Sequence, residues 1–533
     1  MIAIVATAIL TRTLFTTNVT QQRGYPRRRG PGFMQGQGAK PASPANGADA
    51  NAMAERQDQP SHWTATEHSI TINGEKINYT ATCGYLPVRN RQGKVAANMF
   101  FVAYTRNGEN LHKRPVLFAF NGGPGSSSVW LHMGALGPDR VDMTYHGHLP
   151  KPPYKWVPNQ QSWLPFTDIV MLDAVGTGYS NTVTPGDSEF FGPDGDLAAF
   201  TSAITAYDTM ETRWLSPTFV LGESYGGFRV AGLSQTLLSA GVACNGIISL
   251  SGVLNMPTID GGKDNDLPYI SFLPSECGVA WYHHKLSPAF QVNLVATQTK
   301  AEEFAQGEYA HALMMGSALP KAEEDKVAAT LSSFIGIPKS FILKNNLRIP
   351  DFEFMGVLLR NDRESTGRYD GRIIGQEQTG NQTYPDYDAS DSAVAPVFTA
   401  CINDYLKTNL KFKTDKVYKI MGNVYPWDDS RRNDTSDALR EAMTKNPYMK
   451  TMFCFGRFDL ACPFFGTIYV IRHMNLPPNL ASNIHIHYFM AGHMVYTDTP
   501  SRIKFQKNGE EFIQSCLNAK TPPNSPSTPE ATH

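Results

Sequence analysis

Four short predicted strands between residues 114 and 252 constrain the fold more than any other feature, and the first two are apolar at nearly every position. They read RPVLFAF, TDIVMLDA, TFVLGES and NGIISLSG. Runs of this kind are typical of strands buried on both faces of a sheet. The stretches DLAAFTSAITAYDTMETRWL and SYGGFRVAGLSQTLLSAG, between the later runs, have helical spacing. Alternating strands and helices predict an α/β fold, with a mostly parallel central sheet and helices on both faces.

The pattern extends in both directions along the chain. HSITINGEKINYTAT alternates apolar and polar residues around an Asn-Gly pair, which predicts a hairpin, and ANMFFVAYT predicts a further strand. Helix-like stretches and loops rich in Asp, Asn and Tyr then interrupt the rhythm, which returns at YMKTMFCFGRFD. We therefore expect a core formed by residues 63–262 and 411–520, with an inserted lid at 263–410.

The two ends of the chain have a different composition. The run MIAIVATAIL resembles the apolar part of a signal peptide without its basic region, so residues 1–20 are interpreted as a truncated signal segment. Export to a periplasmic or extracellular location is the resulting expectation. Residues 21–62 and 521–533 are rich in Gly, Pro and polar side chains, which predicts a disordered linker and a disordered tail.

Charge and cysteine content limit the function classes. The 47 basic and 48 acidic residues nearly cancel, which argues against a nucleic-acid partner. The apolar run at the start is too short to span a bilayer, so no stable membrane insertion is expected. The seven cysteines have no zinc-type spacing, and both one or two disulfides and buried unpaired thiols remain open.

Ser224 has the sequence context of a nucleophile. It lies in LGESYGGF, between a predicted strand and a predicted helix, with Gly222 and Gly226 two positions to either side. A sharp strand-to-helix turn exposes a serine at the top of a sheet, and bulky neighbours would clash in such a turn. The stretch therefore predicts a nucleophile elbow rather than a helix cap.

An elbow serine needs a base and an acid, which follow it in the order Asp or Glu and then His. His493 lies in the glycine-containing loop FMAGHMVYTDTP, after the predicted strand IHIHYFM, and Asp459 ends another strand in FGRFDLACP. Both are predicted at the carboxyl edge of a parallel sheet, where ligands bind. Four other histidines are weaker candidates for the base. His485 and His487 are predicted on a packed strand face, and His283 and His284 in the lid. No metal site is expected.

A glycine-rich loop follows an early strand in FAFNGGPGSSSVWLHMGALGP. Acyl transfer needs backbone N–H groups directed at a developing oxyanion, and glycines allow the backbone to approach closely. In this architecture one donor is the residue after the nucleophile, here Tyr225, and the other comes from an early loop.

With these blocks in order, NGGPGSSS, GESYGG, GRFDLACP and GHMV, the chain resembles the serine carboxypeptidase family, as a bacterial-type member. The resemblance implies an α/β-hydrolase fold with an inserted lid. It also implies removal of single residues from a free peptide C-terminus, without a cofactor. The site residues that it implies are the triad Ser224, Asp459 and His493 and the oxyanion-hole amides of Gly123 and Tyr225.

The resemblance also implies a site for the terminal carboxylate of a peptide substrate. Asn121 and Gly122 would donate hydrogen bonds to it, Glu223 would share a proton with it, and Met494 would line the pocket of the leaving residue. Well-known members carry a second glutamate where this chain has Ala135. One carboxyl group of that network is therefore absent, and we expect a weaker preference for acidic pH.

Three alternative functions share part of this pattern. An esterase or an acyltransferase could use the same triad. The sequence does not reveal the nucleophile that resolves the acyl-enzyme, but the full set of carboxypeptidase-type blocks favours the peptidase. Proline iminopeptidases share the GGPG loop, but GESYGG argues against them. A catalytically inactive binding protein usually lacks a member of the triad, and all three members are present here. A serine-active-site probe that fails to label the folded protein would revive this last alternative.

Overall fold

The sheet begins with the hairpin that the sequence predicts. β1 (Thr64–Ile72) and β2 (Glu75–Arg89) pair antiparallel. Asn73 and Gly74 join them with φ angles of 51° and 84°, the positive values that a type I′ turn requires. The computed structural model describes residues 63–262 and 264–518, so the predictions for 1–62 and 521–533 lie outside the described residues.

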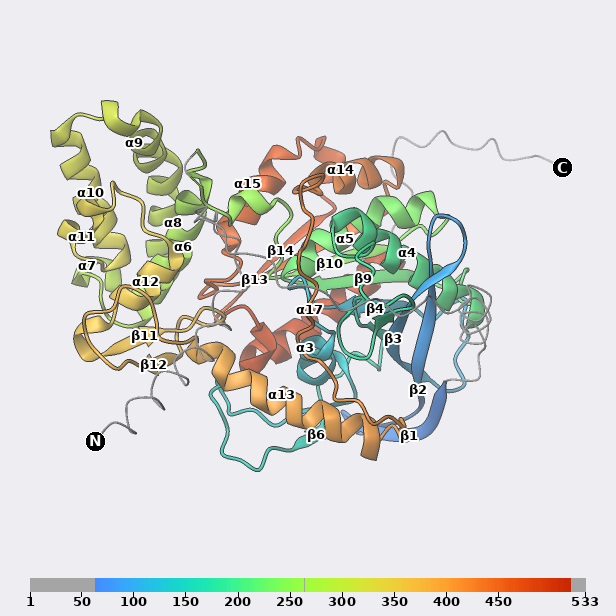
Figure 1. Cartoon of the computed structure of the whole chain (residues 1–533). Helices are drawn as coiled ribbons and strands as arrows, with labels where there is room; N and C mark the ends of the chain where they lie inside the picture. Colours follow the sequence, from blue (N-terminus) through green and yellow to red (C-terminus); the bar gives the residue numbers. More distant parts are fainter. Residues whose placement is uncertain (1–62, 263, 519–533) are drawn as a thin grey trace, which may run out of the picture. The chain divides into compact units, whose positions relative to one another are not determined.

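One large sheet organises the described chain (Figure 1), in the order β1-β2-β3-β7-β4-β9-β10-β13-β14. The pairs from β1 to β7 are antiparallel, and every pair from β7 to β14 is parallel. This topology confirms the prediction of a mostly parallel sheet. The remaining strands of this path are β3 (Val95–Arg106), β4 (Val116–Phe120), β7 (Asp168–Leu172), β9 (Thr218–Glu223), β10 (Gly246–Leu250), β13 (Lys450–Gly456) and β14 (Ile484–Phe489).

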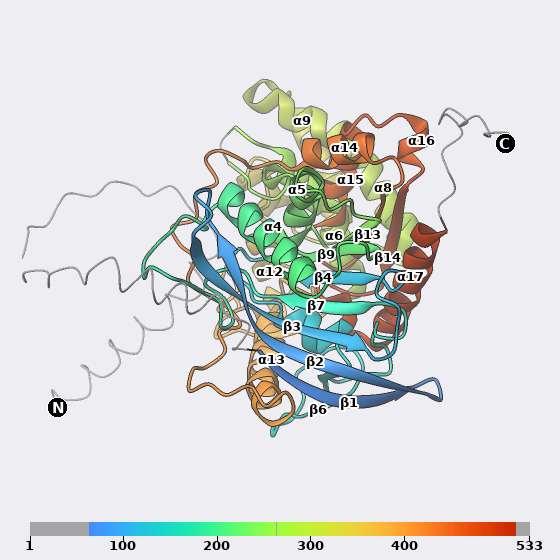
Figure 2. The same ribbon diagram turned by 90° about the vertical axis from the view of Figure 1, so that its right-hand side faces the viewer.

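The central strands are buried on both faces, as their apolar runs predict. Along β4, Val116, Phe118 and Phe120 pack into one hydrophobic core, whereas Leu117 and Ala119 pack into another. Helices close both cores, and α4 and α13 lie on opposite sides of the strands (Figure 2). The helices of the first core include α4 (Pro193–Met210) and α5 (Tyr225–Ser239), and those of the second include α13 (Ala389–Thr408) and α17 (Thr499–Leu517).

A group of helices follows β10 in the chain and precedes α13. α6 (Leu267–Tyr282) packs against α8 (Leu294–Phe304) and α10 (Lys321–Ile335) within this group, and against α15 (Phe464–His473) of the core. α13 falls within the predicted lid range 263–410, but its Phe398 packs on Trp130 in the second core. The action of the remaining helices as a lid stays a prediction. Within the described residues, no helix is both long and apolar enough to cross a membrane.

All seven cysteines belong to the described residues and are buried, and Cys83, Cys244, Cys277, Cys401, Cys454 and Cys516 are free thiols. Of the two alternatives left open by the sequence, the structure therefore has free buried thiols. Burial raises the pKa of Cys244 and Cys516 to about 12, which keeps these thiols protonated and unreactive near neutral pH.

Candidate active site

The turn from β9 to α5 holds Ser224 in a strained conformation, with φ 64° and ψ −126°. The turn is so tight that a Cβ atom on Gly222 would lie 2.1 Å from the carbonyl oxygen of Gly226. The backbone N–H of Ser224 donates to the carbonyl of Leu250 on β10, at 3.0 Å. Strain of this kind persists where the surrounding structure enforces it, which is common at functional sites.

His493 and Asp459 lie together although 34 residues separate them in the chain. The Nδ1 atom of His493 lies 2.8 Å from Oδ2 of Asp459, and both side chains are buried. The other carboxylate oxygen, Oδ1, accepts backbone N–H groups from Ala461 at 2.7 Å and from Cys462 at 2.9 Å. Because Nδ1 donates its hydrogen to the carboxylate in this hydrogen bond, Nε2 of His493 is the nitrogen that can act as a base.

Two residues that sequence reasoning missed hold the backbone and ring of His493. The Tyr369 carbonyl accepts the His493 N–H at 2.5 Å, and the Tyr369 ring stacks on the imidazole with centroids 5.6 Å apart. Ser251 Oγ donates to the His493 carbonyl at 2.8 Å. Both residues come from other parts of the chain and belong to no motif, so the sequence held no signal for them.

Burial and charge act in opposite directions on His493. Burial disfavours the imidazolium, but the charge and hydrogen bond of Asp459, together with the charge of Glu223, outweigh it. The net effect raises the pKa of His493 above its ordinary value. The ring is thereby prepared to hold a proton received from a nucleophile.

The Ser224 hydroxyl lies beside the turn that holds Asp459. Its Oγ atom is 3.8 Å from Sγ of Cys462, in the turn whose N–H groups hold Asp459. The nucleophile candidate and the acid–base candidates therefore meet at the carboxyl ends of β9 and β13, which both pair with β10. This is the ligand side of a parallel sheet.

The glycine loop after β4 lies against the start of α5. A Cβ atom on Gly122 would be 2.4 Å from the backbone nitrogen of Tyr225, so only glycine allows this approach. Gly123 has a φ of 105°, a conformation that also favours glycine. The two segments that carry the predicted oxyanion-hole amides are therefore in direct contact, at the positive end of a helix dipole.

Arg229, a further residue not identified from the sequence, fixes this contact from within α5. Its guanidinium donates to Asp196 Oδ2 at 2.6 Å and to the Asn121 carbonyl oxygen, and it is fully buried. The salt bridge with Asp196 joins α5 to α4, and the hydrogen bond to Asn121 joins α5 to the glycine loop. A lone arginine in the apolar stretch YGGFRVAGL was the signal that could have revealed it.

The carboxyl group of Glu223, the residue before the nucleophile, is only 1 % exposed. Tyr496 donates to it, with its hydroxyl 2.8 Å from Oε2 and 3.1 Å from Oε1, and Asn121 also donates to it. Burial raises the pKa of Glu223 to about 7, against the opposing effects of His493 and of these two donors. A proton can therefore reside on this carboxyl group near neutral pH.

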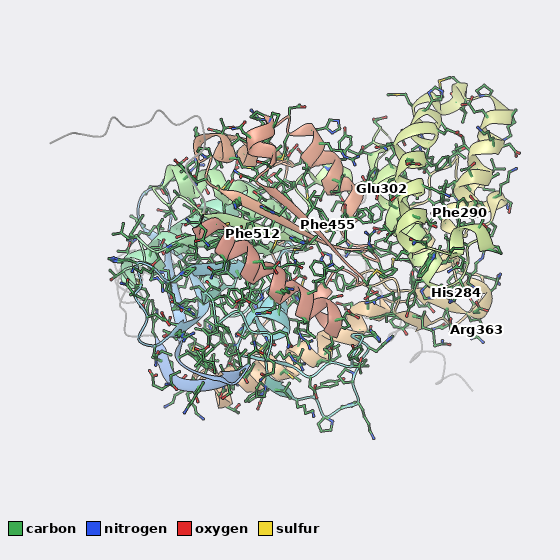
Figure 3. The ribbon with its side chains drawn as sticks, turned by 180° about the vertical axis from the view of Figure 1, so that it is seen from behind. His284, Phe290, Glu302, Arg363, Phe455 and Phe512 are labelled. Atoms are coloured by element: carbon green, nitrogen blue, oxygen red, sulfur yellow. The ribbon has the colours of Figure 1, made fainter. Side chains whose placement is uncertain are left out.

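Met494 and the remaining histidines have other surroundings. Met494 is buried directly after His493, and its carbonyl accepts the Thr497 N–H at 3.0 Å. His284 lies among the helices that follow α6, far from Phe455 on β13 (Figure 3). His485 and His487 are half-buried along β14. Within residues 63–262 and 264–518, no group of three or more His, Cys, Asp or Glu side chains could hold a metal ion.

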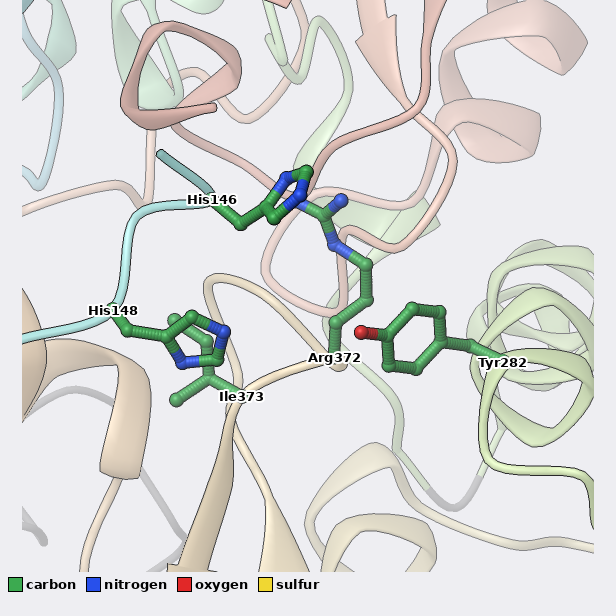
Figure 4. Close-up of a pocket in the computed structure, with 5 residues that line it drawn as sticks. All are labelled: His146, His148, Tyr282, Arg372 and Ile373. Atoms are coloured by element: carbon green, nitrogen blue, oxygen red, sulfur yellow. The ribbon is translucent and has the colours of Figure 1, made fainter. Parts of the chain in front are cut away.

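A cavity of about 150 Å³ (Figure 4) is lined by His146, His148, Tyr282, Arg372 and Ile373. Arg372 pairs with Asp370 at 2.7 Å, and Asp370 Oδ2 accepts the backbone N–H of Gly492 at 3.2 Å. The cavity wall therefore supports the residue that precedes His493.

Comparison with known proteins places this chain in a family. The family model described as serine carboxypeptidase matches residues 72–487, a range that includes Ser224 and Asp459 and ends just before His493. Serine carboxypeptidase-like 22 of Arabidopsis thaliana is 28% identical over 200 residues, which are 36% of this chain and 39% of the relative. The pheromone-processing carboxypeptidase kex1 of Schizosaccharomyces japonicus is 27% identical over 198 residues, 35% of this chain and 33% of the relative.

The chain thus matches less than half of the length of these curated relatives. Among solved structures, the prohormone-processing carboxypeptidase Kex1 from Saccharomyces cerevisiae has a TM-score of 0.54 and 16% sequence identity. That likeness covers 82% of this chain and 92% of the other, and it confirms the predicted α/β-hydrolase fold.

Proposed function

This chain belongs to the serine carboxypeptidase family, and on that premise we propose that it releases amino acids one at a time from the free C-terminus of peptides. The observation that carries the proposal is the buried carboxyl group of Glu223 beside Ser224, with Asn121 donating to it. A carboxyl group that is protonated near neutral pH can hydrogen-bond a substrate carboxylate, which an ionised one would repel.

Each step of the proposed reaction uses a group whose position is described above. Nε2 of His493 accepts the Ser224 hydroxyl proton while Oγ attacks the carbonyl carbon of the last peptide bond. Asp459 holds the imidazole and stabilises its positive charge. The oxyanion forms beside the amides of Gly123 and Tyr225.

Collapse of this tetrahedral intermediate breaks the peptide bond. His493 gives its proton to the leaving amino group, and the free amino acid departs from an acyl-enzyme ester on Ser224. A water molecule then loses a proton to His493 and attacks the ester, and Ser224 regains its proton as the shortened peptide leaves. No cofactor takes part in this sequence.

The terminal carboxylate of the substrate is bound beside Glu223. Asn121 and the Gly122 backbone donate to it, and protonated Glu223 donates its own hydrogen. Met494, beside His493, contributes an apolar wall to the pocket of the leaving residue. A peptide with an amidated C-terminus lacks the negative charge that these donors recognise, and it should therefore be a poorer substrate.

An esterase or an acyltransferase on the same triad is the second candidate. Ala135 favours it, because this chain lacks the second carboxyl group that the resemblance implies for carboxylate recognition. The peptidase and its rival differ in their substrate and in the nucleophile that resolves the acyl-enzyme.

Time-resolved mass spectrometry of one peptide decides between them. The peptide is incubated with the wild-type protein and with Ser224→Ala, in free-acid and amidated forms. Stepwise loss of C-terminal residues, absent in the variant and slowed by amidation, supports the carboxypeptidase. An intact peptide, together with ester hydrolysis by the wild type alone, would leave the triad in place and replace the peptidase by the esterase.

A further inference from the structure

Tyr496 is the residue nearest to Glu223 for which the proposed reaction has no role. The two lie 273 positions apart in the chain, yet the Tyr496 hydroxyl is within hydrogen-bond distance of both carboxyl oxygens. The exposed fraction is 0 % for Tyr496 and 1 % for Glu223, so solvent does not compete for this contact. A buried hydrogen bond to a carboxylate is among the stronger ones in a protein.

The Tyr496 ring packs against a glycine, which leaves room for it. Gly134 faces the ring so closely that a Cβ atom there would lie 2.5 Å from Cε2 of Tyr496. Gly134 belongs to a single π-helical turn, η3 (His132–Leu136), which also contains Ala135. The turn that lacks a carboxyl group at Ala135 is therefore the one that makes room for the phenol.

We propose that Tyr496 is a positioning residue of the carboxylate-binding site. Its phenol donates permanently to one oxygen of Glu223, and so directs the acid proton of Glu223 from the other oxygen toward the terminal carboxylate of the substrate. The inference rests on the proposed function for its substrate. The hydrogen bond and its effect on the titration of Glu223 can be tested without any substrate.

The chemistry of a phenol differs here from that of a second carboxyl group. Burial raises the pKa of Tyr496 well above 10, so its hydroxyl stays a donor over the whole working range of pH. A carboxyl partner would itself gain and lose a proton in that range. With Tyr496 as partner, Glu223 is the only member of the pair that titrates near neutral pH.

The other titratable groups that face this pair are His493, Asp459 and Tyr369. The charge of His493 lowers the pKa of Glu223 and that of Asp459 raises it, while Tyr369 faces the phenol. Tyr496 lowers the pKa of Glu223 because it donates to the ionised form. Removing the hydroxyl alone should therefore raise that pKa, with the neighbouring charges unchanged.

The first test is an infrared pH titration of the protonated carboxyl band, which is assigned to Glu223 by its loss in Glu223→Gln. Tyr496→Phe keeps the ring over Gly134 and should move the midpoint upward by about one pH unit. The matched control is Tyr405→Phe, which removes another buried phenol of the same core, one bonded to Tyr104 at 3.0 Å. Equal midpoints in the wild type and Tyr496→Phe would overturn the proposal.

The second test measures kcat and KM between pH 5 and 9, for a free-acid peptide and for an ester without a carboxylate. Tyr496→Phe should raise KM for the peptide about tenfold at pH 6 and leave ester hydrolysis within about twofold of the wild type. Loss of kcat on both substrates, with KM unchanged, would assign a merely structural role and contradict the proposal. If the wild-type protein cleaves only the ester, the proposed function fails, and the infrared titration still decides the role of Tyr496.

Discussion

The two oxygens of Asp459 have separate tasks. Oδ1 is held by the N–H groups of Ala461 and Cys462, and Oδ2 faces His493. In Asp459→Asn, the amide oxygen would keep the two N–H donors, so its NH₂ group would face Nδ1 of His493. The ring would then carry its proton on Nε2, which could no longer accept one from Ser224. We expect kcat to fall roughly 10⁴-fold with little change in KM, measured on a peptide or an ester.

A buried aspartate distant from the site is the control for this substitution. Asp208 lies near the C-terminal end of α4, where Arg213 is the charged group that acts on it, so Asp208→Asn should keep kcat within about twofold of the wild type. An Asp459→Asn variant that is folded and retains a tenth or more of the wild-type kcat would show that the imidazole does not depend on this carboxylate.

The pH dependence of the reaction follows from two buried groups at the site. His493 must be neutral to accept a proton, and its pKa is raised, so activity should decline on the acid side at a higher pH than for an ordinary histidine. Glu223 must be protonated to bind a carboxylate, and burial raises its pKa to about 7. We expect kcat/KM for a free-acid peptide to peak near neutral pH and to fall at alkaline pH as Glu223 loses its proton. For an ester without a carboxylate, kcat/KM should not show this alkaline fall. A peptide maximum near pH 5 would be incompatible with this assignment.

At the scale of elements, the sequence predicted the features that depend on residues close together in the chain. The Asn73–Gly74 turn, the strands buried on both faces and the strand–turn–helix around Ser224 each depend on neighbours within a few residues. The contacts of Glu223 with Tyr496 and of Arg229 with the glycine loop join distant segments, and only the packed chain reveals them. Ala135 was an indirect signal for the contact between Glu223 and Tyr496. Without a second carboxyl group at position 135, Glu223 needs a hydrogen-bond donor from another residue.

The elbow between β9 and α5 has no room for a side chain at Gly222. Gly222→Ala would place a methyl group against the Gly226 carbonyl and force the turn open. We expect loss of Ser224 labelling by a serine-active-site probe and a fall of about 3 kcal/mol or more in the free energy of unfolding. Gly307→Ala is the control, because a Cβ atom there meets nothing within 4 Å. If the probe labelled Gly222→Ala as rapidly as the wild type, the turn would accommodate the methyl group, and the expectation would be wrong.

At the scale of the whole molecule, a buried carboxyl group on α4 affects stability. Asp208 is 1 % exposed, and neither of its oxygens has a hydrogen-bond partner among the described residues. Burial raises its pKa to about 7, against the opposing charge of Arg213. The folded chain therefore keeps a proton there that the unfolded chain loses near pH 4, and stability falls as the pH rises from about 4 to about 7.

Asp208→Asn removes this pH dependence. We expect the variant to be more stable than the wild type at pH 8, by on the order of 2 kcal/mol, and nearly equal to it at pH 4, measured by chemical denaturation. Asp437→Asn, at a side chain that is 96% exposed, should show no such divergence. Parallel stability curves for the wild type and Asp208→Asn between pH 4 and 8 would contradict the assignment.

The position of β10 between β9 and β13 affects when the proposed catalytic residues come together during synthesis of the chain. During synthesis, the nucleophile turn and β10 leave the ribosome well before β13 and the His493 loop, because the helices that follow β10 come between them. Until β13 docks on the free side of β10, the emerging protein carries Ser224 without a base. If the proposed mechanism holds, a nascent chain of this topology has no hydrolase activity until the last strands of its sheet have docked.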